Sequence, residues 1–169
     1  MTAVAIRGEE RELALSEVEA VRSAVPEGDY RVRLDAIRAA LSGGEVEDGG
    51  DLDSLLGEAK PPDYVSVQAF IDPAREPELD SLIARCRETG CAVTHGLGPR
   101  YLHSTGQLHK GGPPSGRFVQ VVDDPGEELA IPGRRFGFAR LIRAQADGDL
   151  ASLRERGRPI VRVELEDIS

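Results

Sequence analysis

The chain has 169 residues, which suits one domain with a real hydrophobic core, and its formal net charge is −9. The acidic balance argues against binding to nucleic acid or to an anionic membrane surface through bulk electrostatics. There is no apolar run of membrane-spanning length and no signal-peptide pattern at the N-terminus, so we expect a soluble, cytoplasmic protein without a membrane partner.

Helices are predicted in the first sixty residues. Shorter helices are expected over residues 34–41 and 52–59. The longest predicted helix, over residues 9–25, rests on apolar residues that recur at helical intervals: Ala14, Val18, Val21 and Val25.

Glycines and acidic residues alternate over residues 43–51, a composition typical of an exposed, mobile linker. We therefore expect an acidic, helical N-terminal segment over residues 1–60 and a second domain over residues 61–169.

Beyond residue 61 the apolar pattern alternates between strand and helix. Strands are predicted over residues 64–71, 91–95, 117–122 and 159–165. Helices are predicted over a segment that opens at Pro77 and ends at Gly90, and over residues 137–146 and 150–156. This order is typical of an α/β fold with a mostly parallel sheet and helices on both faces. In the last strand, Arg162 and Glu164 alternate with valines, which predicts a half-exposed edge strand.

The glycine-rich segment, residues 96–113, differs from the rest of the chain. No Asp or Glu occurs between Glu88 and Asp123, while three basic residues and all three histidines do: Arg100, Lys110, Arg117, His95, His103 and His109. Counting three basic and no acidic residues, the local charge is +3. A positive, glycine-rich stretch that enters a short helix after a strand favours an anionic ligand such as phosphate or carboxylate.

This segment resembles a known family. His103-Ser104, Gln107-Leu108 and Gly112-Pro113 match the His-Ser-x-x-Gln-Leu-x-x-x-Gly-Pro pattern of glucose-6-phosphate isomerases of the sugar-isomerase (SIS) fold. The sequence of residues 98–113 is most similar to the isomerase part of bacterial transaldolase/glucose-6-phosphate isomerase fusion proteins. The resemblance covers roughly residues 61–165 and continues downstream in Ile131-Pro132-Gly133, Phe136-Gly137-Phe138, Arg143-Ala144-Gln145-Ala146-x-Gly148-Asp149 and Leu153-Arg154-Glu155-Arg156-Gly157-Arg158.

The resemblance implies an aldose–ketose isomerase of carbohydrate metabolism that interconverts glucose 6-phosphate and fructose 6-phosphate without a cofactor. His103 matches the family's ring-opening histidine, and an imidazole exchanges protons near neutral pH. Gln107 would orient that histidine or a sugar hydroxyl. Arg100 and Lys110 would supply positive charge to a phosphate or an enediolate, the alternative being a solvated surface. Ser104 would contact the substrate or cap the helix.

Two parts of the family's site have no match in this chain. The proton-transferring glutamate of a Glu-Ser-x-Gly-Lys type motif is missing, and so is the Ser/Thr-rich loop that binds the sugar phosphate. Three hypotheses therefore stay open. The chain is an isomerase module that needs a complementary isomerase or transaldolase segment or a second copy, or a catalytically silent sugar-phosphate-binding domain, or a structural assembly domain.

Neither a metal site nor a redox site is expected. The spacings of His95, His103 and His109 place them on no common helix face. Cys86 and Cys91 have neither a metal nor a redox spacing, and we expect both to be small buried residues.

Overall fold

The computed structural model describes residues 50–123, 129–133 and 137–168, and four isolated helical positions before them: Leu15, Glu19, Ser23 and Arg38. Apart from those four positions, the helices predicted over residues 9–25 and 34–41 lie outside the described residues. The same holds for most of the predicted linker over residues 43–51. In the part of the chain that is described, no helix combines the length and apolar character needed to cross a bilayer.

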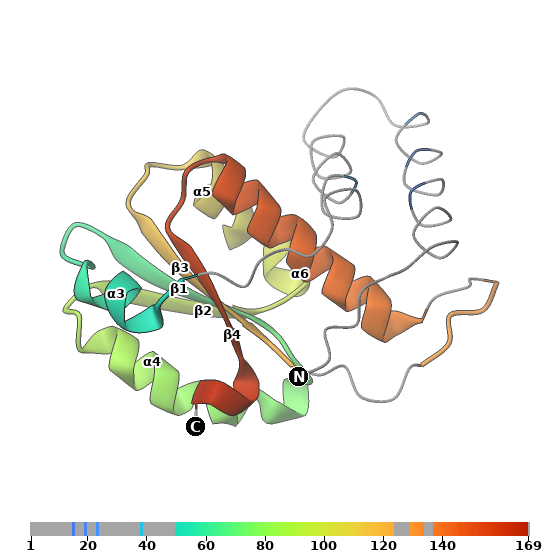
Figure 1. The fold of residues 1–169 in the computed structure, drawn as a ribbon, viewed down its shortest axis with the longest axis horizontal. Coiled ribbons are helices and arrows are strands. Elements are labelled where there is room, and N and C mark those ends of the chain that lie inside the picture. The colour runs from blue at the N-terminus through green and yellow to red at the C-terminus, as the bar shows by residue number, and fades with distance from the viewer. Residues whose placement is uncertain are drawn as a thin grey trace.

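Four parallel strands form one sheet in the order β2-β1-β3-β4 (Figure 1). The strands are β1 (Tyr64–Phe70), β2 (Ala92–Leu97), β3 (Gly116–Val122) and β4 (Ile160–Glu164). All three strand pairs are parallel, with β1 between β2 and β3. The predicted α/β fold with a parallel sheet is confirmed.

Helices cover both faces of the sheet (Figure 1). One face, called here the α4 face, carries α3 (Leu52–Gly57), η1 (Pro73–Leu79), α4 (Asp80–Arg87) and η3 (Leu165–Ile168). The other, called the α6 face, carries η2 (Arg100–His103), α5 (Thr105–Gly111) and α6 (Phe138–Glu155). Right-handed crossovers explain the division, because the strand order reverses direction after β2 and the later helices must change sides.

The core on the α4 face is apolar. Alternate residues of β1 and β3 pack against α3 and α4, and Leu55 and Leu56 bring α3 into the same cluster. Cys86 and Cys91 are both buried and free, as expected for small core residues.

The α6 face has smaller apolar clusters and, between them, a buried polar row. Gln68, Gln120 and Arg162 occupy neighbouring register positions across β1, β3 and β4, and each is buried. Arg162 Nε donates to Gln120 Oε1 at 2.7 Å, and Gln120 Nε2 donates to the Ala146 carbonyl at 2.9 Å. The prediction that β4 is half-exposed at Arg162 is therefore wrong, because α6 covers this residue and leaves it 6% exposed.

Two helix predictions need correction. The helices expected over residues 137–146 and 150–156 form one helix, α6, since Asp147 and Asp149 find charged partners instead of breaking it. Helical structure after β1 begins at Pro73 rather than Pro77. The Asp72 side chain accepts from the Ala74 amide at 2.8 Å and so caps η1.

Candidate functional site

The glycine-rich segment leaves the carboxyl end of β2, the edge at which parallel α/β sheets bind ligands. Two glycines allow this path. A Cβ atom at Gly98 would lie 2.4 Å from the Phe70 ring, and one at Gly96 would lie 3.0 Å from Tyr101 Cβ. The Gly98 amide also donates to the Ala69 carbonyl at 2.7 Å. The segment is thus held tightly against β1 before it enters η2.

Asp149 of α6 contacts two residues of the glycine-rich segment. Its side chain is 1% exposed, and its Oδ1 forms an ion pair with Lys110 Nζ. Its Oδ2 accepts a hydrogen bond from the Tyr101 hydroxyl at 2.5 Å. Burial, with the Asp149 charge adding to it, raises the pKa of Tyr101 well above its usual value, so this hydroxyl stays protonated and donates. The structure therefore places Lys110 in an internal ion pair.

His103 is the last residue of η2, directly before the turn into α5. Arg100 begins η2, and its side chain is exposed. No ion pair links Arg100 to a carboxylate among the residues that the structure describes, which leaves its charge available to a ligand.

Ser104 and Gln107 both bond to the backbone of η2. The Ser104 hydroxyl donates to the Tyr101 carbonyl at 3.2 Å, and Gln107 Nε2 donates to the Leu102 carbonyl at 3.3 Å. Ser104 does occupy the position before α5, but its side chain makes no capping hydrogen bond to that helix. The predicted capping role is wrong, because the hydroxyl is used in the preceding turn.

Most of the positive charge counted between Glu88 and Asp123 is neutralised by other parts of the chain. Arg117 bonds to Asp63 at 2.9 Å and to Glu58 at 3.2 Å. This contact lowers the pKa of the Asp63 carboxyl. With Lys110 paired to Asp149, two of the three basic residues counted in the sequence have acidic partners. The local charge of +3 therefore overstates what an anion would meet.

His109 lies inside the molecule, 4% exposed. Its Nδ1 is 3.0 Å from the Tyr64 hydroxyl and its Nε2 is 3.3 Å from the Ser66 hydroxyl. The Phe118 ring contacts it edge-on, with centroids 5.3 Å apart. These contacts make His109 a core residue on the buried side of α5.

We expect His109 to make the stability of the protein pH-dependent. Burial lowers its pKa below the unfolded value of about 6.5; Asp149 opposes this shift and Lys110 adds to it. Between the two pKa values the unfolded chain binds more protons. The full stability is thus present above about pH 6.5, falls as the pH drops through that value, and levels off below the folded pKa.

Urea midpoints measured from pH 8 to pH 5 test this. The wild-type midpoint should fall more steeply below pH 6.5 than that of His109→Gln. Parallel curves for the two proteins would mean that His109 is not buried in its neutral form.

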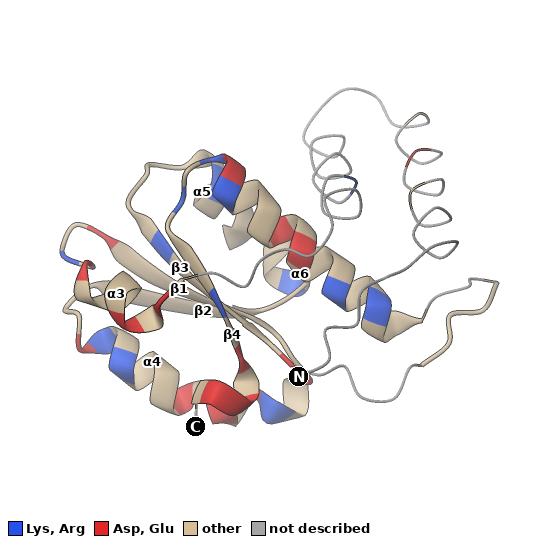
Figure 2. Cartoon of the chain, in the orientation of Figure 1, with Lys and Arg blue, Asp and Glu red and all other residues tan. Residues whose placement is uncertain are grey.

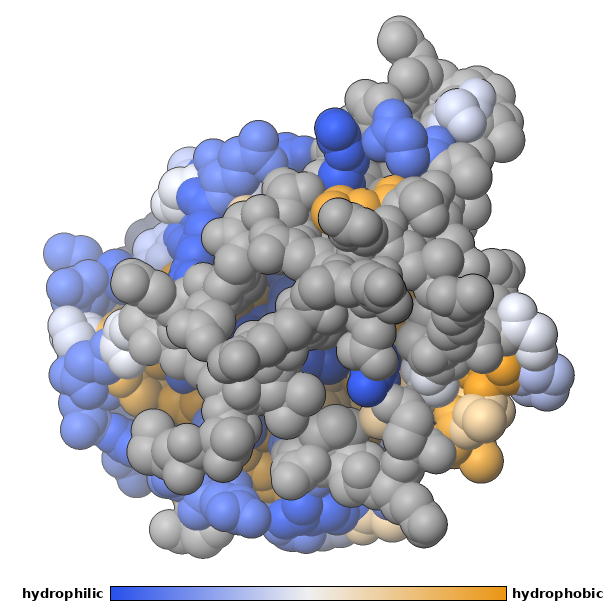
Figure 3. All heavy atoms as spheres, turned by 45° about the vertical axis from the view of Figure 1, so that its right-hand side comes forward, coloured by the Kyte–Doolittle hydropathy of each residue, from blue (hydrophilic) through white to orange (hydrophobic). Residues whose placement is uncertain are grey.

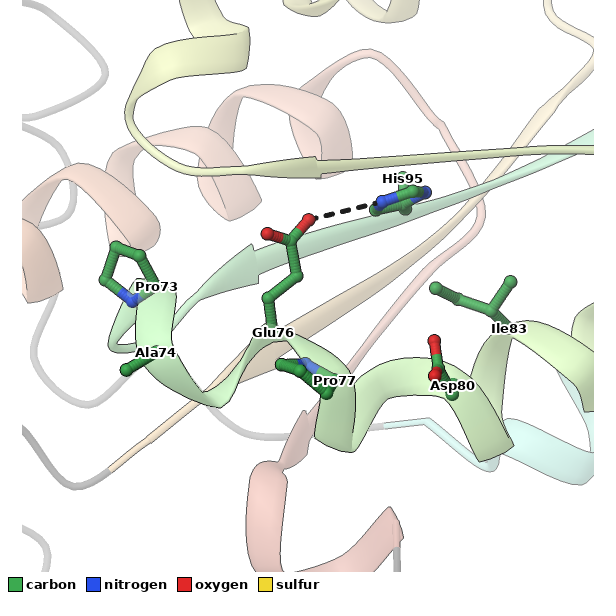
Figure 4. Close-up of a pocket in the computed structure, with 7 residues that line it drawn as sticks. All are labelled: Pro73, Ala74, Glu76, Pro77, Asp80, Ile83 and His95. Carbon is green, nitrogen blue, oxygen red and sulfur yellow. Dashed lines mark ion pairs between the residues drawn. The ribbon is translucent and has the colours of Figure 1, made fainter.

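His95 lies on the other face of the sheet. It pairs in register with Val67, and its Nε2 is 3.3 Å from Glu76 Oε1 of η1 (Figure 4). Both side chains border an open groove of about 420 Å³ lined by Pro73, Ala74, Glu76, Pro77, Asp80, Ile83 and His95. The sheet separates His95 from His109, and no cluster of three or more metal-binding side chains occurs among the described residues.

An ion pair bridges the carboxyl ends of the two central strands. Arg75, which follows β1, pairs with Asp123, which follows β3, and also bonds to Glu78 at 2.8 Å. Glu78 and then Asp123 raise the pKa of Arg75. Sequence reasoning missed this pair, although an acidic residue directly after a buried strand was a usable signal.

Residues of both charges occur along α4 and α6, whereas the charged residues of η3 are all acidic (Figure 2). Figure 3 shows a mostly hydrophilic described surface with small hydrophobic areas. The large apolar residues exposed in the described part are Leu108, Leu129 and Phe138.

These features define an α/β protein with a four-stranded parallel sheet and a glycine-rich segment at its carboxyl edge. No family model matches the chain, and no curated protein matches it. Among solved structures it is similar to a hypothetical protein from Thermus thermophilus, with a TM-score of 0.55 and 20% identity. The match covers 81% of this chain and 39% of the Thermus chain, so this chain spans well under half of that protein. At this identity the likeness shows the fold alone.

Proposed function

We propose that the chain is a cytoplasmic module of a sugar-phosphate aldose–ketose isomerase of the glucose-6-phosphate isomerase type. The observation that carries the proposal is the position of the His-Ser-x-x-Gln-Leu-x-x-x-Gly-Pro pattern. Residues 103–113 follow the carboxyl end of β2, where a parallel sheet binds its ligands. The parallel α/β fold supports the same assignment.

His103 is assigned the ring-opening step. Its imidazolium would protonate the ring oxygen as the bond between C1 and that oxygen breaks, while the C1 hydroxyl proton leaves to water. Gln107 follows one helical turn later in α5 and is only partly buried, and we assign it a hydrogen bond to a sugar hydroxyl.

The phosphate is assigned to Arg100 rather than Lys110. Arg100 is exposed at the start of η2, whereas the Lys110 side chain is 12% exposed and paired with Asp149. A single exposed arginine with nearby amides supports only weak binding, on the order of millimolar.

The enediol step needs a base, and the family's glutamate motif has no match in this chain. A complementary isomerase or transaldolase segment, or a second copy, would have to supply the glutamate and the phosphate loop. Lys110 pairs with Asp149 and Arg117 with Asp63, which leaves little positive charge for a phosphate and so favours one alternative, a structural assembly domain.

Ring opening and isomerisation can be measured separately. Opening and reclosing the ring interconverts the two anomers of glucose 6-phosphate and needs no enediol base. The isolated chain should accelerate anomer exchange, measured by magnetisation transfer, yet form almost no fructose 6-phosphate. His103→Ala should abolish the acceleration, and His95→Ala, on the opposite face of the sheet, is the matched control. Anomer exchange no faster than in buffer would exclude the isomerase assignment. The two alternatives without catalysis, a sugar-phosphate-binding domain and a structural assembly domain, would then remain.

A further inference from the structure

The glycine-rich segment has little stability of its own. η2 and α5 are four and seven residues long, and neither has a side-chain cap at its N-terminus. Helices this short do not persist in water without tertiary contacts. The hydrogen bonds of Ser104 and Gln107 close the turn locally and attach it to nothing outside the segment.

Asp149 attaches both ends of residues 101–110 to α6. Tyr101 lies two positions before His103 and Lys110 lies seven positions after it, and each bonds to a different carboxylate oxygen of Asp149. The carboxylate itself sits in the middle of α6, a helix of 18 residues packed on the sheet. A charge this deeply buried is tolerated only while its partners stay in place, so the arrangement strongly favours one position of the segment.

The packing around Tyr101 has the same effect. Its ring lies edge-on to Phe70 with centroids 5.9 Å apart, and the space for it exists because Gly96 has no side chain. A Cβ atom at Gly106 would lie 3.1 Å from the Tyr101 carbonyl oxygen. At the other end, Arg158 donates to the Gly112 carbonyl at 2.6 Å. The segment is therefore fixed by contacts with α6, with Phe70 of β1 and with Arg158, which precedes β4.

We propose that Asp149 is a positioning residue, whose two bonds to Tyr101 and Lys110 hold residues 101–110, and with them His103 and Gln107, at the carboxyl edge of the sheet. Its role in catalysis rests on the proposed function, while its role in holding the segment does not. The ion pair also explains why Lys110, within an apparent anion site, is only slightly exposed: its partner is the protein's own Asp149 carboxylate.

The test replaces Asp149 by asparagine in the full chain. The amide can still accept from Tyr101 but no longer balances the Lys110 charge. Amide hydrogen exchange should rise about tenfold or more in residues 100–111 and stay unchanged in β1 and β3. Asp147→Asn is the matched control, because Asp147 lies on the same helix and pairs with Arg162 and Arg143 instead of with the segment. It should leave residues 100–111 protected.

Tyr101→Phe is a second variant in case Asp149→Asn fails to fold. It keeps the ring and the ion pair, and should raise exchange in the same residues by a smaller factor. Exchange that rises uniformly over the chain in either variant, or that stays unchanged in residues 100–111, would overturn the positioning role.

Anomer exchange of glucose 6-phosphate separates this inference from the proposed function. If the wild-type chain is active, Asp149→Asn should lower the rate within the complex about a hundredfold, with the dissociation constant changed less than about threefold. If the anomer-exchange rate fell by the same factor only because the dissociation constant rose, Asp149 would not act as a positioning residue. If the wild-type chain is inactive, the proposed function fails, and the exchange pattern alone still decides whether Asp149 holds the segment.

Discussion

Replacing Phe118 by alanine should lower the free energy of unfolding by about 3–5 kcal/mol, the largest effect expected of any single substitution here. Phe118 is 0% exposed and packs with Leu150, Leu153 and Ile160 between β3 and α6. Its ring also lies edge-on to Tyr64, with centroids 6.0 Å apart. The truncation would leave a cavity that these rigid neighbours cannot fill.

Phe138→Ala is the matched control for Phe118→Ala. Phe138 is 45% exposed at the start of α6, so the same change should cost only about 0.5 kcal/mol. Urea unfolding followed by circular dichroism measures both variants. Similar midpoints for the two would show that β3 and α6 do not pack through Phe118.

The second large effect is expected at Arg162. Its side chain is 2% exposed, bonds to Gln120 at 2.7 Å, and forms an ion pair with Asp147 at 2.7 Å. Arg162→Leu would remove the arginine from two buried oxygens, Gln120 Oε1 and Asp147 Oδ1. We expect a loss of about 3 kcal/mol, measured as a lower urea midpoint.

Arg143→Leu removes a cation from the same carboxylate and serves as the control. Arg143 is 37% exposed and contacts Asp147 at 3.7 Å, so the loss should stay below about 1 kcal/mol. If Arg162→Leu proved as stable as Arg143→Leu, or more stable than the wild type, the polar row on the α6 face would not contribute to stability.

The fold was predictable because β-type alternation and helical periodicity are local properties. All four strands appear within a few residues of the predicted positions. The helix predicted from Pro77 begins earlier because of a local cap by Asp72. The helices predicted over residues 137–146 and 150–156 are one helix, and here the contacts are non-local: Asp147 and Asp149 each pair with a cation from another element, and α6 continues through them.

The candidate site was harder to predict, because its charge depends on contacts between residues that lie far apart in the sequence. Local sequence located the glycine-rich segment and its position after β2. It could not show that Lys110 and Arg117 would meet Asp149 and Asp63, since these acids lie far away in the chain. Charge counted within one segment therefore overestimated the positive surface. The partners depend on tertiary packing, of α5 against α6 for Lys110 and of β3 beside β1 for Arg117.

Titration of the full chain with glucose 6-phosphate, followed by amide chemical shifts, tests the central claim most directly. We predict weak, saturable shifts confined to residues 96–113 that decrease as salt rises, because Arg100 and the segment's amides would hold the phosphate. Arg100→Ala should reduce them, and unphosphorylated glucose should not reproduce them. Shifts that are absent from this segment, or equal with glucose, would contradict a sugar-phosphate site.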